Sequence, residues 1–153
     1  MAVDYPGNIL TSSDGITWNS IASGTSNSLY AITFGKGLFV TAGTEGTILT
    51  SSDGISWTER NSGTTTAIYK IAYGGNQFVA VGLSGLGLTS PDGISWTTQT
   101  SGTTNNLQGI TYAQNKYIAA GASGTIISSE DGSTWNSGDS GTSNHLINVD
   151  YLN

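Results

Sequence analysis

Large apolar side chains alternate with small or polar ones along short stretches of this chain. In residues 29–34 the apolar side chains of Tyr30, Ile32 and Phe34 occupy every second position. This alternation predicts a β-strand with one bulky face. Residues 38–42 are apolar almost without interruption, which is typical of a strand buried on both faces.

Two more strands are predicted before the pattern starts again. Residues 47–51 form the third strand, and a Ser-Asp-Gly turn leads to a fourth, expected to begin at Ile55 and Trp57. A stretch rich in Asn, Ser and Thr, residues 61–66, returns to the next first strand. Short turns join all four segments, so one unit is an antiparallel meander.

The whole unit recurs with a fixed spacing of 39 residues. A period of 20–50 residues marks an array of one supersecondary unit. The four copies cover residues 1–153, which we interpret as a single all-β domain; a β-trefoil suits the length but needs three repeats. The repeated aspartates and tryptophans are Asp14, Asp53, Asp92 and Asp131, and Trp18, Trp57, Trp96 and Trp135.

These repeated residues are expected to be structural. An Asp carboxylate can accept hydrogen bonds from N–H groups of its own loop, and the following Gly supplies a positive φ at low cost. The Trp four residues later is expected to place its ring on the core below the turn.

The turn resembles the Asp box, or bacterial neuraminidase repeat. The family pattern is Ser-x-Asp-x-Gly-x-Thr-Trp, and this chain has Ser12-Ser13-Asp14-Gly15-Ile16-Thr17-Trp18. Its loop is one residue shorter, because Asp and Gly are adjacent. The resemblance implies a β-propeller of four-stranded antiparallel blades, with the box between the third and fourth strands. Such propellers include sialidases, other glycosidases, receptors, lectin-like modules and photosystem assembly factors. The leading Ser recurs as Ser51, Ser90 and Ser129.

The phase of the repeat predicts how the propeller closes. Counted by 39, residues 1–4 align with a shortened second strand and residues 146–152 with a lone first strand. Pairing 147–152 with 1–4 would complete a blade and bury Val149 and Tyr151. Within one chain this gives a four-bladed ring, and between two chains an eight-bladed homodimer. Both remain open, and we favour the dimer.

Composition excludes several classes of partner. The formal net charge is −6 with four Lys and Arg residues, so neither nucleic acid nor an anionic membrane surface is an expected partner. No signal peptide or transmembrane segment is visible. The chain has no Cys, so no thiolate metal site is expected, and the cellular compartment stays open.

No catalytic constellation is found. A sialidase of this family would need an arginine triad, whereas Arg60 is the single arginine, and His145 is the single histidine. No metal-ligand cluster and no cofactor are expected, so we predict that the protein is not an enzyme. The alternative is a fragment of a glycoside hydrolase that uses carboxylate pairs, with Glu45 and Asp139 as the residues to test.

The expected functional surface is the propeller face formed by two sets of variable loops. One set joins fourth to first strands, and the other joins second to third strands. Their hydroxyl and amide side chains suit a neutral glycan or a polar protein partner. We therefore predict a binding or assembly module: a lectin-like protein, an attachment or decoration protein of a cell surface or virion, or a designed repeat scaffold. The candidate ligand-binding residues are Asn27, Glu45, Thr66, Asn105, Asn144 and His145.

Overall fold

The strands form four separate antiparallel sheets, which we call the first to fourth blades. The computed structural model describes residues 1–152, and each blade is a meander of strands in chain order. The first blade has three strands and each of the others has four. The blades comprise β1 (Ala2–Val3), β2 (Asn8–Thr11) and β3 (Asn19–Ala22); β4 (Leu29–Gly35), β5 (Leu38–Gly43), β6 (Ile48–Ser51) and β7 (Thr58–Arg60); β8 (Ile68–Gly74), β9 (Gln77–Gly82), β10 (Leu86–Ser90) and β11 (Thr97–Thr100); and β12 (Leu107–Ala113), β13 (Lys116–Gly121), β14 (Ile126–Ser129) and β15 (Asn136–Gly138).

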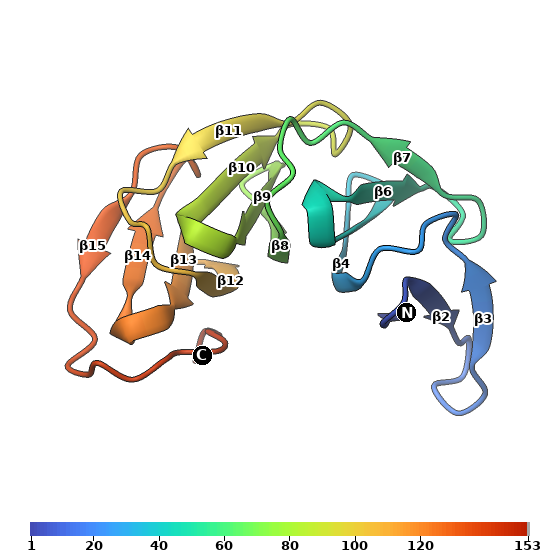
Figure 1. Cartoon of the computed structure of the whole chain (residues 1–153), viewed down its shortest axis with the longest axis horizontal. Helices are drawn as coiled ribbons and strands as arrows, with labels where there is room; N and C mark the ends of the chain where they lie inside the picture. The colour runs from blue at the N-terminus through green and yellow to red at the C-terminus, as the bar shows by residue number, and fades with distance from the viewer. Residues whose placement is uncertain (153) are drawn as a thin grey trace.

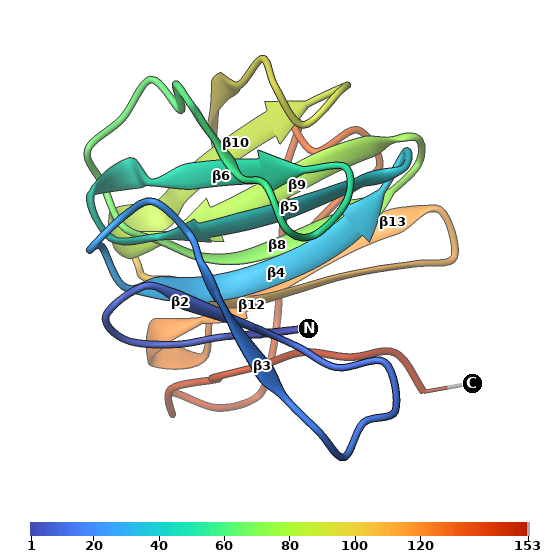
Figure 2. The same ribbon diagram turned by 90° about the vertical axis from the view of Figure 1, so that its right-hand side faces the viewer.

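The blades stand side by side in an open arc (Figure 1). The inner strands β4, β8 and β12 contact one another in succession, while β3, β7, β11 and β15 lie on the outer side of the arc (Figure 1). The view turned by 90° shows the inner and middle strands of successive blades layered over one another (Figure 2). The N- and C-terminal ends of the chain lie at the two ends of the arc (Figure 1).

The strand register repeats with the sequence. In the second blade Leu29 is opposite Gly43 and Ala31 is opposite Ala42, with a bulge between the two pairs. The third and fourth blades carry the same bulge at the same place in the repeat. Each equivalent hairpin therefore presents the same residues to its neighbours.

The hydrophobic core lies between blades rather than within one sheet. One cluster joins the second and third blades, and its fully buried members include Val40, Ile48, Phe78 and Leu88. A second cluster joins the third and fourth blades, and a third joins the first and second. This sandwiching explains why the second strand of each unit is apolar on both faces.

The fourth strands begin later than the sequence analysis predicted. β7 begins at Thr58, and Ile55, which was expected to open this strand, is exposed. The reason is local: Asp53 Oδ1 accepts the N–H groups of Ile55 and Ser56, each at 2.8 Å, so both residues belong to the turn.

The expected pairing of the two chain ends does not form within the chain. β1 pairs only with β2, and residues 146–152 belong to no strand. Val149 is half-buried and Tyr151 is exposed, instead of both being buried between blades. The four sheets therefore form an open arc and not a closed ring.

Candidate functional site

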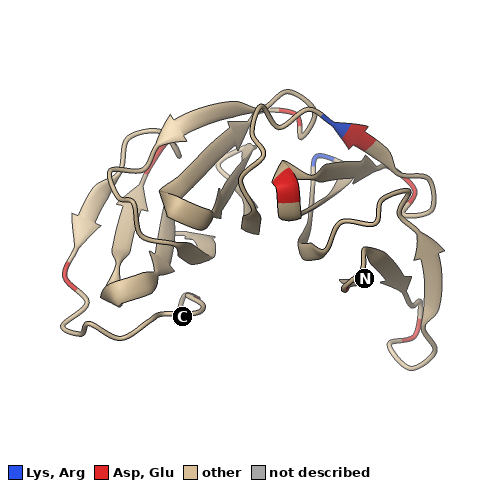
Figure 3. Cartoon of the chain, in the orientation of Figure 1, with Lys and Arg blue, Asp and Glu red and all other residues tan. Residues whose placement is uncertain are grey.

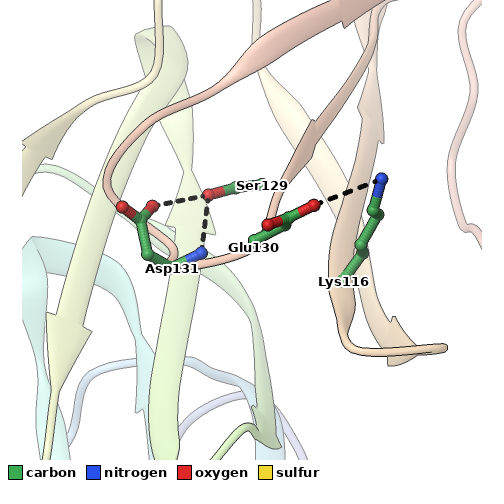
Figure 4. Close-up of polar contacts among 4 residues, drawn as sticks. All are labelled: Lys116, Ser129, Glu130 and Asp131. Atoms are coloured by element: carbon green, nitrogen blue, oxygen red, sulfur yellow. Dashed lines mark hydrogen bonds and ion pairs between the residues drawn. The ribbon is translucent and has the colours of Figure 1, made fainter.

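The four Asp turns share one hydrogen-bonding pattern. In the fourth blade Asp131 Oδ1 accepts the N–H groups of Ser133 at 2.9 Å and Thr134 at 2.7 Å. Ser129 Oγ donates to the same carboxylate oxygen at 3.0 Å and accepts the N–H group of Asp131 (Figure 4). It also accepts the N–H group of Gly132. The side chains of the leading Ser and of the Asp thus both hydrogen-bond to the backbone of the turn. Lys116 Nζ lies 3.5 Å from Glu130 Oε1 beside this turn, and both side chains are exposed.

These hydrogen bonds favour the ionised carboxylates. The N–H groups of Thr17 and Ile16 lower the pKa of Asp14 to about 2, and those of Ser56 and Ile55 lower the pKa of Asp53 to about 2. The pKa values of Asp92 and Asp131 are lowered by equivalent backbone donors. A carboxylate held ionised by its own loop is suited to stabilising a turn and not to donating a proton.

The tryptophans pack below these turns with one exception. Trp57, Trp96 and Trp135 are half-buried against the three clusters between blades. The indole N–H of Trp96 donates to the carbonyl of Gly93 at 3.1 Å, and Trp135 makes the same bond to Gly132. Trp18 is 45% exposed, contrary to the expectation of core packing, because no preceding blade lies against the first one.

The two sets of variable loops meet on one face of the arc. Thr44, in the 3₁₀ turn Thr44–Gly46 between β5 and β6, donates its N–H to the carbonyl of Ser28 at 2.9 Å. In the fourth blade Ala122, in the turn Ala122–Gly124, donates to Asn106 at 2.8 Å. The loop entering each inner strand is therefore tied to the turn of the same blade.

Two candidate ligand-binding residues add side-chain hydrogen bonds between these loops. Asn27 Nδ2 donates to Thr47 Oγ1 and Asn105 Nδ2 donates to Thr125 Oγ1, each at 2.8 Å. Both amides are half-buried, so these donors hold the loops together.

A shallow polar pocket recurs beside these amides. In the second blade a pocket of about 500 Å³ is lined by Asn27, Glu45, Thr47, Arg60 and Asn61. A pocket of about 460 Å³ takes the same place in the fourth blade. It has a matching lining, in which Asn105, Ser123, Thr125 and Asp139 occupy the repeat positions of Asn27, Glu45, Thr47 and Asn61.

The other candidates lie outside these two linings. Thr66 is half-buried, and Asn144 and His145 are exposed in the segment that follows β15. Asn144 contributes its backbone, since its carbonyl accepts the N–H of Gly124 at 2.7 Å. The structure therefore brings Asn27 and Glu45 together, and separately places Asn105 in the equivalent pocket.

Sequence reasoning did not place residues at the ends of the fourth strands among the ligand-binding candidates. Arg60, Asn61 and Asp139 line the pockets, and Arg60 Nε is held by Thr50 Oγ1 at 2.8 Å. The available signal was a Ser-Gly-Thr triplet that recurs with the same period. Its serine is buried at three of its four positions, which are Ser23, Ser62, Ser101 and Ser140. Ser101 Oγ donates to the carbonyl of Gly85 at 2.6 Å, which fixes the residues just before it against the turn.

The two carboxylates named for the glycoside hydrolase alternative do not form a pair. Glu45 lines the pocket of the second blade and Asp139 that of the fourth. Among residues 1–152 no group of three or more His, Cys, Asp or Glu side chains is placed to hold a metal ion. Acidic residues lie mainly on turns, with Glu59 on β7 and Glu45 on a 3₁₀ turn (Figure 3).

Two solved structures resemble this arrangement of blades. YCF48 from Cyanidioschyzon merolae aligns with a TM-score of 0.61 at 22% identity, over 71% of this chain and 36% of its own. YCF48 bound to D1 peptide aligns with a TM-score of 0.71 at 18% identity, over 95% of this chain and 51% of its own. The fold is that of a β-propeller.

The present chain spans about half the length of the propeller that it matches over 95% of its own residues. No protein-family model matches the sequence, and no curated protein matches it either. Within residues 1–152 no helix is both long and apolar enough to cross a membrane. At these identities the likeness establishes the fold, so function has to be argued from the surface of this chain.

Proposed function

We propose that this chain is a single, non-enzymatic propeller domain that binds a polar partner through its loop face. The observation that carries the proposal is the recurrence of the same polar pocket in the second and fourth blades, at about 500 and 460 Å³. Equivalent pockets on a common scaffold allow weak contacts to add, because a second contact to the same partner is intramolecular.

The chemistry of the pockets favours an uncharged or basic polar ligand. Their walls present mainly hydroxyl, amide and backbone groups. The pocket of the second blade also contains Glu45, Glu59 and Arg60, and that of the fourth blade contains Asp139 and Trp135. The net charge of −6 disfavours a polyanion. A polypeptide segment and a neutral glycan both fit this description, and the solved propeller bound to D1 peptide favours the polypeptide. The Ser-x-Asp turns act as Asp boxes that hold the blades, and they take no part in binding.

Paired arrays of peptides and glycans test this function. We expect binding to uncharged or basic peptides, weakened several-fold by Glu45→Ala together with Ser123→Ala. Ser52→Ala, on an exposed residue of the Asp turn, is the matched control and should leave binding unchanged. Selective binding to glycans would assign the lectin role instead, and binding to neither class would contradict the proposal.

The hydrolase alternative has its own test. Because Glu45 and Asp139 line pockets of different blades, they cannot act on one glycosidic bond within the chain. We expect no turnover of chromogenic glycosides. Turnover that is abolished by Glu45→Gln or Asp139→Asn would establish an enzyme.

A further inference from the structure

The face of the first blade that points away from the second blade has no neighbouring blade. Leu10 is half-buried, whereas Leu49 and Leu88, at the same place in the repeat, are 2% and 0% exposed because each packs against the preceding blade. A β-carbon added to Gly93 would lie 3.1 Å from Val40 of the preceding blade, but one added to Gly15 meets nothing within 4 Å. The surface built to receive a preceding blade is therefore uncovered.

The first blade also lacks an inner strand. Phe34 on β4 faces this gap and is 56% exposed. Its repeat equivalents Tyr73 and Tyr112 are half-buried because each packs on a glycine of the preceding inner strand, Gly35 or Gly74. A strand inserted beside β1 would lie against Phe34, and in residues 146–152 the repeat position of Gly35 and Gly74 is held by Leu152.

The other end of the arc carries the missing strand. Leu146 donates its N–H to the carbonyl of Gly121 at 2.9 Å, the bond that Leu29 makes to Asp4 at 3.2 Å where β4 joins the first blade. A β-carbon on Gly109 would lie 2.7 Å from Asn148 Cα, so the segment lies close against β12. Residues 146–152 thus dock as an inner strand, but no middle strand pairs with them, and Ile147 is 76% exposed.

The middle strands of the fourth blade are likewise uncovered. Ile118 and Ile126 are half-buried, whereas their equivalents Val40 and Ile48 are fully buried by the next blade. The uncovered surface at each end of the arc is therefore the complement of the other.

We propose that a second copy of this chain joins both ends and closes an eight-bladed ring. Residues 146–152 of each copy become the inner strand of the first blade of the other. The register follows from the second blade, where Ile32 is opposite Thr41 and Leu29 is opposite Gly43. Shifted by whole repeats, Val149 lies opposite Ala2 of the partner copy and Leu146 opposite its Asp4.

Polar contacts at the junction follow the same register. Gln77 Nε2 donates to the carbonyl of Asp131 in the next blade at 2.7 Å. The corresponding residues at the junction are Lys116 of one copy and Asp14 of the other, so a Lys ammonium replaces the amide as donor to a backbone carbonyl.

The occupant is a second copy because the arc is open and already packed. The two complementary ends lie on opposite sides of the opening of the arc (Figure 1), and closure within one chain would have to change the packing between blades. Two copies related by a two-fold axis close without such a change and leave no growing end.

Introduced cysteines test the junction directly, since the chain has none of its own. The variants Ala2→Cys and Val149→Cys are made as separate chains, refolded together and oxidised. We expect a disulfide-linked species of twice 15.7 kDa that reducing agent separates. In the double variant Ala2→Cys/Val149→Cys, a disulfide confined to single chains would identify the chain's own first blade as the occupant and overturn the proposal. Ile32→Cys/Thr41→Cys, at the same register inside the second blade, is the control for an intrachain disulfide.

Solution mass supplies a second readout with a matched pair of variants. The intact protein is expected at twice 15.7 kDa by light scattering over a wide range of concentrations. Leu10→Arg places a charge at the proposed junction and should give monomers, whereas Ser20→Arg, on the exposed outer strand β3, should stay dimeric. A monomeric intact protein, a ladder of larger multiples, or a Leu10→Arg variant that remains dimeric would each overturn the ring. If Leu10→Arg does not fold, the mixed-chain disulfide decides.

Discussion

The ring of Tyr73 packs on the backbone of Gly35 in the neighbouring blade. A β-carbon at Gly35 would overlap Cγ and both Cδ atoms of that ring. The same relation joins Tyr112 to Gly74 one repeat later. Inner strands of successive blades therefore approach closely because a glycine receives the aromatic ring of the next strand.

Gly35→Ala should lower the free energy of unfolding by roughly 1–3 kcal/mol, the usual cost of overpacking. The added methyl group has to displace Tyr73, which is itself held against Phe78 with ring centroids 4.7 Å apart. Urea unfolding measures the loss. Combining Gly35→Ala with Tyr73→Ala should recover part of it, and purely additive losses would show that the two residues do not interact.

Low pH should destabilise the protein because the carboxylates of its turn aspartates become protonated. The pKa values of Asp14 and Asp53 fall from 3.8 to about 2 on folding. Their contribution to the free energy of unfolding is therefore complete above the unfolded pKa near 4 and is lost as the pH falls through 2. Urea midpoints measured at pH 6, 4, 3 and 2 should drop mainly below pH 4. Asp53→Asn should flatten this dependence, and an unchanged pH profile in that variant would contradict the assignment.

The loss of stability on removing a turn tryptophan should depend on which blade carries it. Trp96→Ala should cost roughly 3 kcal/mol, because its ring packs between two blades beside Phe78 at 6.4 Å between centroids. Trp18→Ala should cost little in a monomeric arc, where the ring is 45% exposed. In the closed dimer it should cost as much as Trp96→Ala, and only at protein concentrations that populate the dimer.

Tyr117 carries a hydrogen bond between the third and fourth blades. Its hydroxyl donates to the carbonyl of Gly74 at 2.5 Å, and burial raises the pKa of Tyr117 to about 12. Tyr117→Phe should therefore lower the free energy of unfolding by about 1 kcal/mol without repacking, since Phe39 and Phe78 occupy this position in other repeats. A loss as large as that of Tyr117→Ala would show that the hydroxyl accounts for the whole effect, and no loss in Tyr117→Phe would contradict the stabilising role of the hydrogen bond.

Truncation after His145 removes the segment that docks on β12. We expect the shortened chain to aggregate or unfold, because the inner edge of the fourth blade and the junction are both exposed. Circular dichroism and light scattering check this. A truncated chain with unchanged melting temperature and oligomeric state would exclude any closed ring that uses this segment.

Much of the fold could be predicted because periodicity is a strong signal. The alternation at Tyr30, Ile32 and Phe34 and the apolar run at 38–42 correspond to β4 and β5. The boundary at Ile55 was wrong because the Asp53 carboxylate takes the N–H groups that a strand would need. That competition depends on the local geometry of a shortened loop, which propensity does not contain.

The candidate site was harder to predict because its residues come from two loops that meet only after folding. Glu45 and Asn27 belong to variable loops and could be proposed. By contrast, Arg60 ends the outer strand β7 and Asn61 follows it, and both look like ordinary solvent-facing residues in the sequence. Their place in the pocket depends on Ser62, which is buried beside Gly46. The sequence also does not decide whether the ring closes within one chain or between two, because the strand register at the junction is the same in both cases.

The lengths of the strands have a consequence for crowded solutions. Inner strands β4, β8 and β12 have seven residues each, but the outermost strands β3, β7, β11 and β15 have only three or four. An exposed edge this short offers too few free N–H and C=O groups to template another strand. Each blade tapers toward the solvent, so sheets of neighbouring molecules have little edge along which to fuse into fibrils.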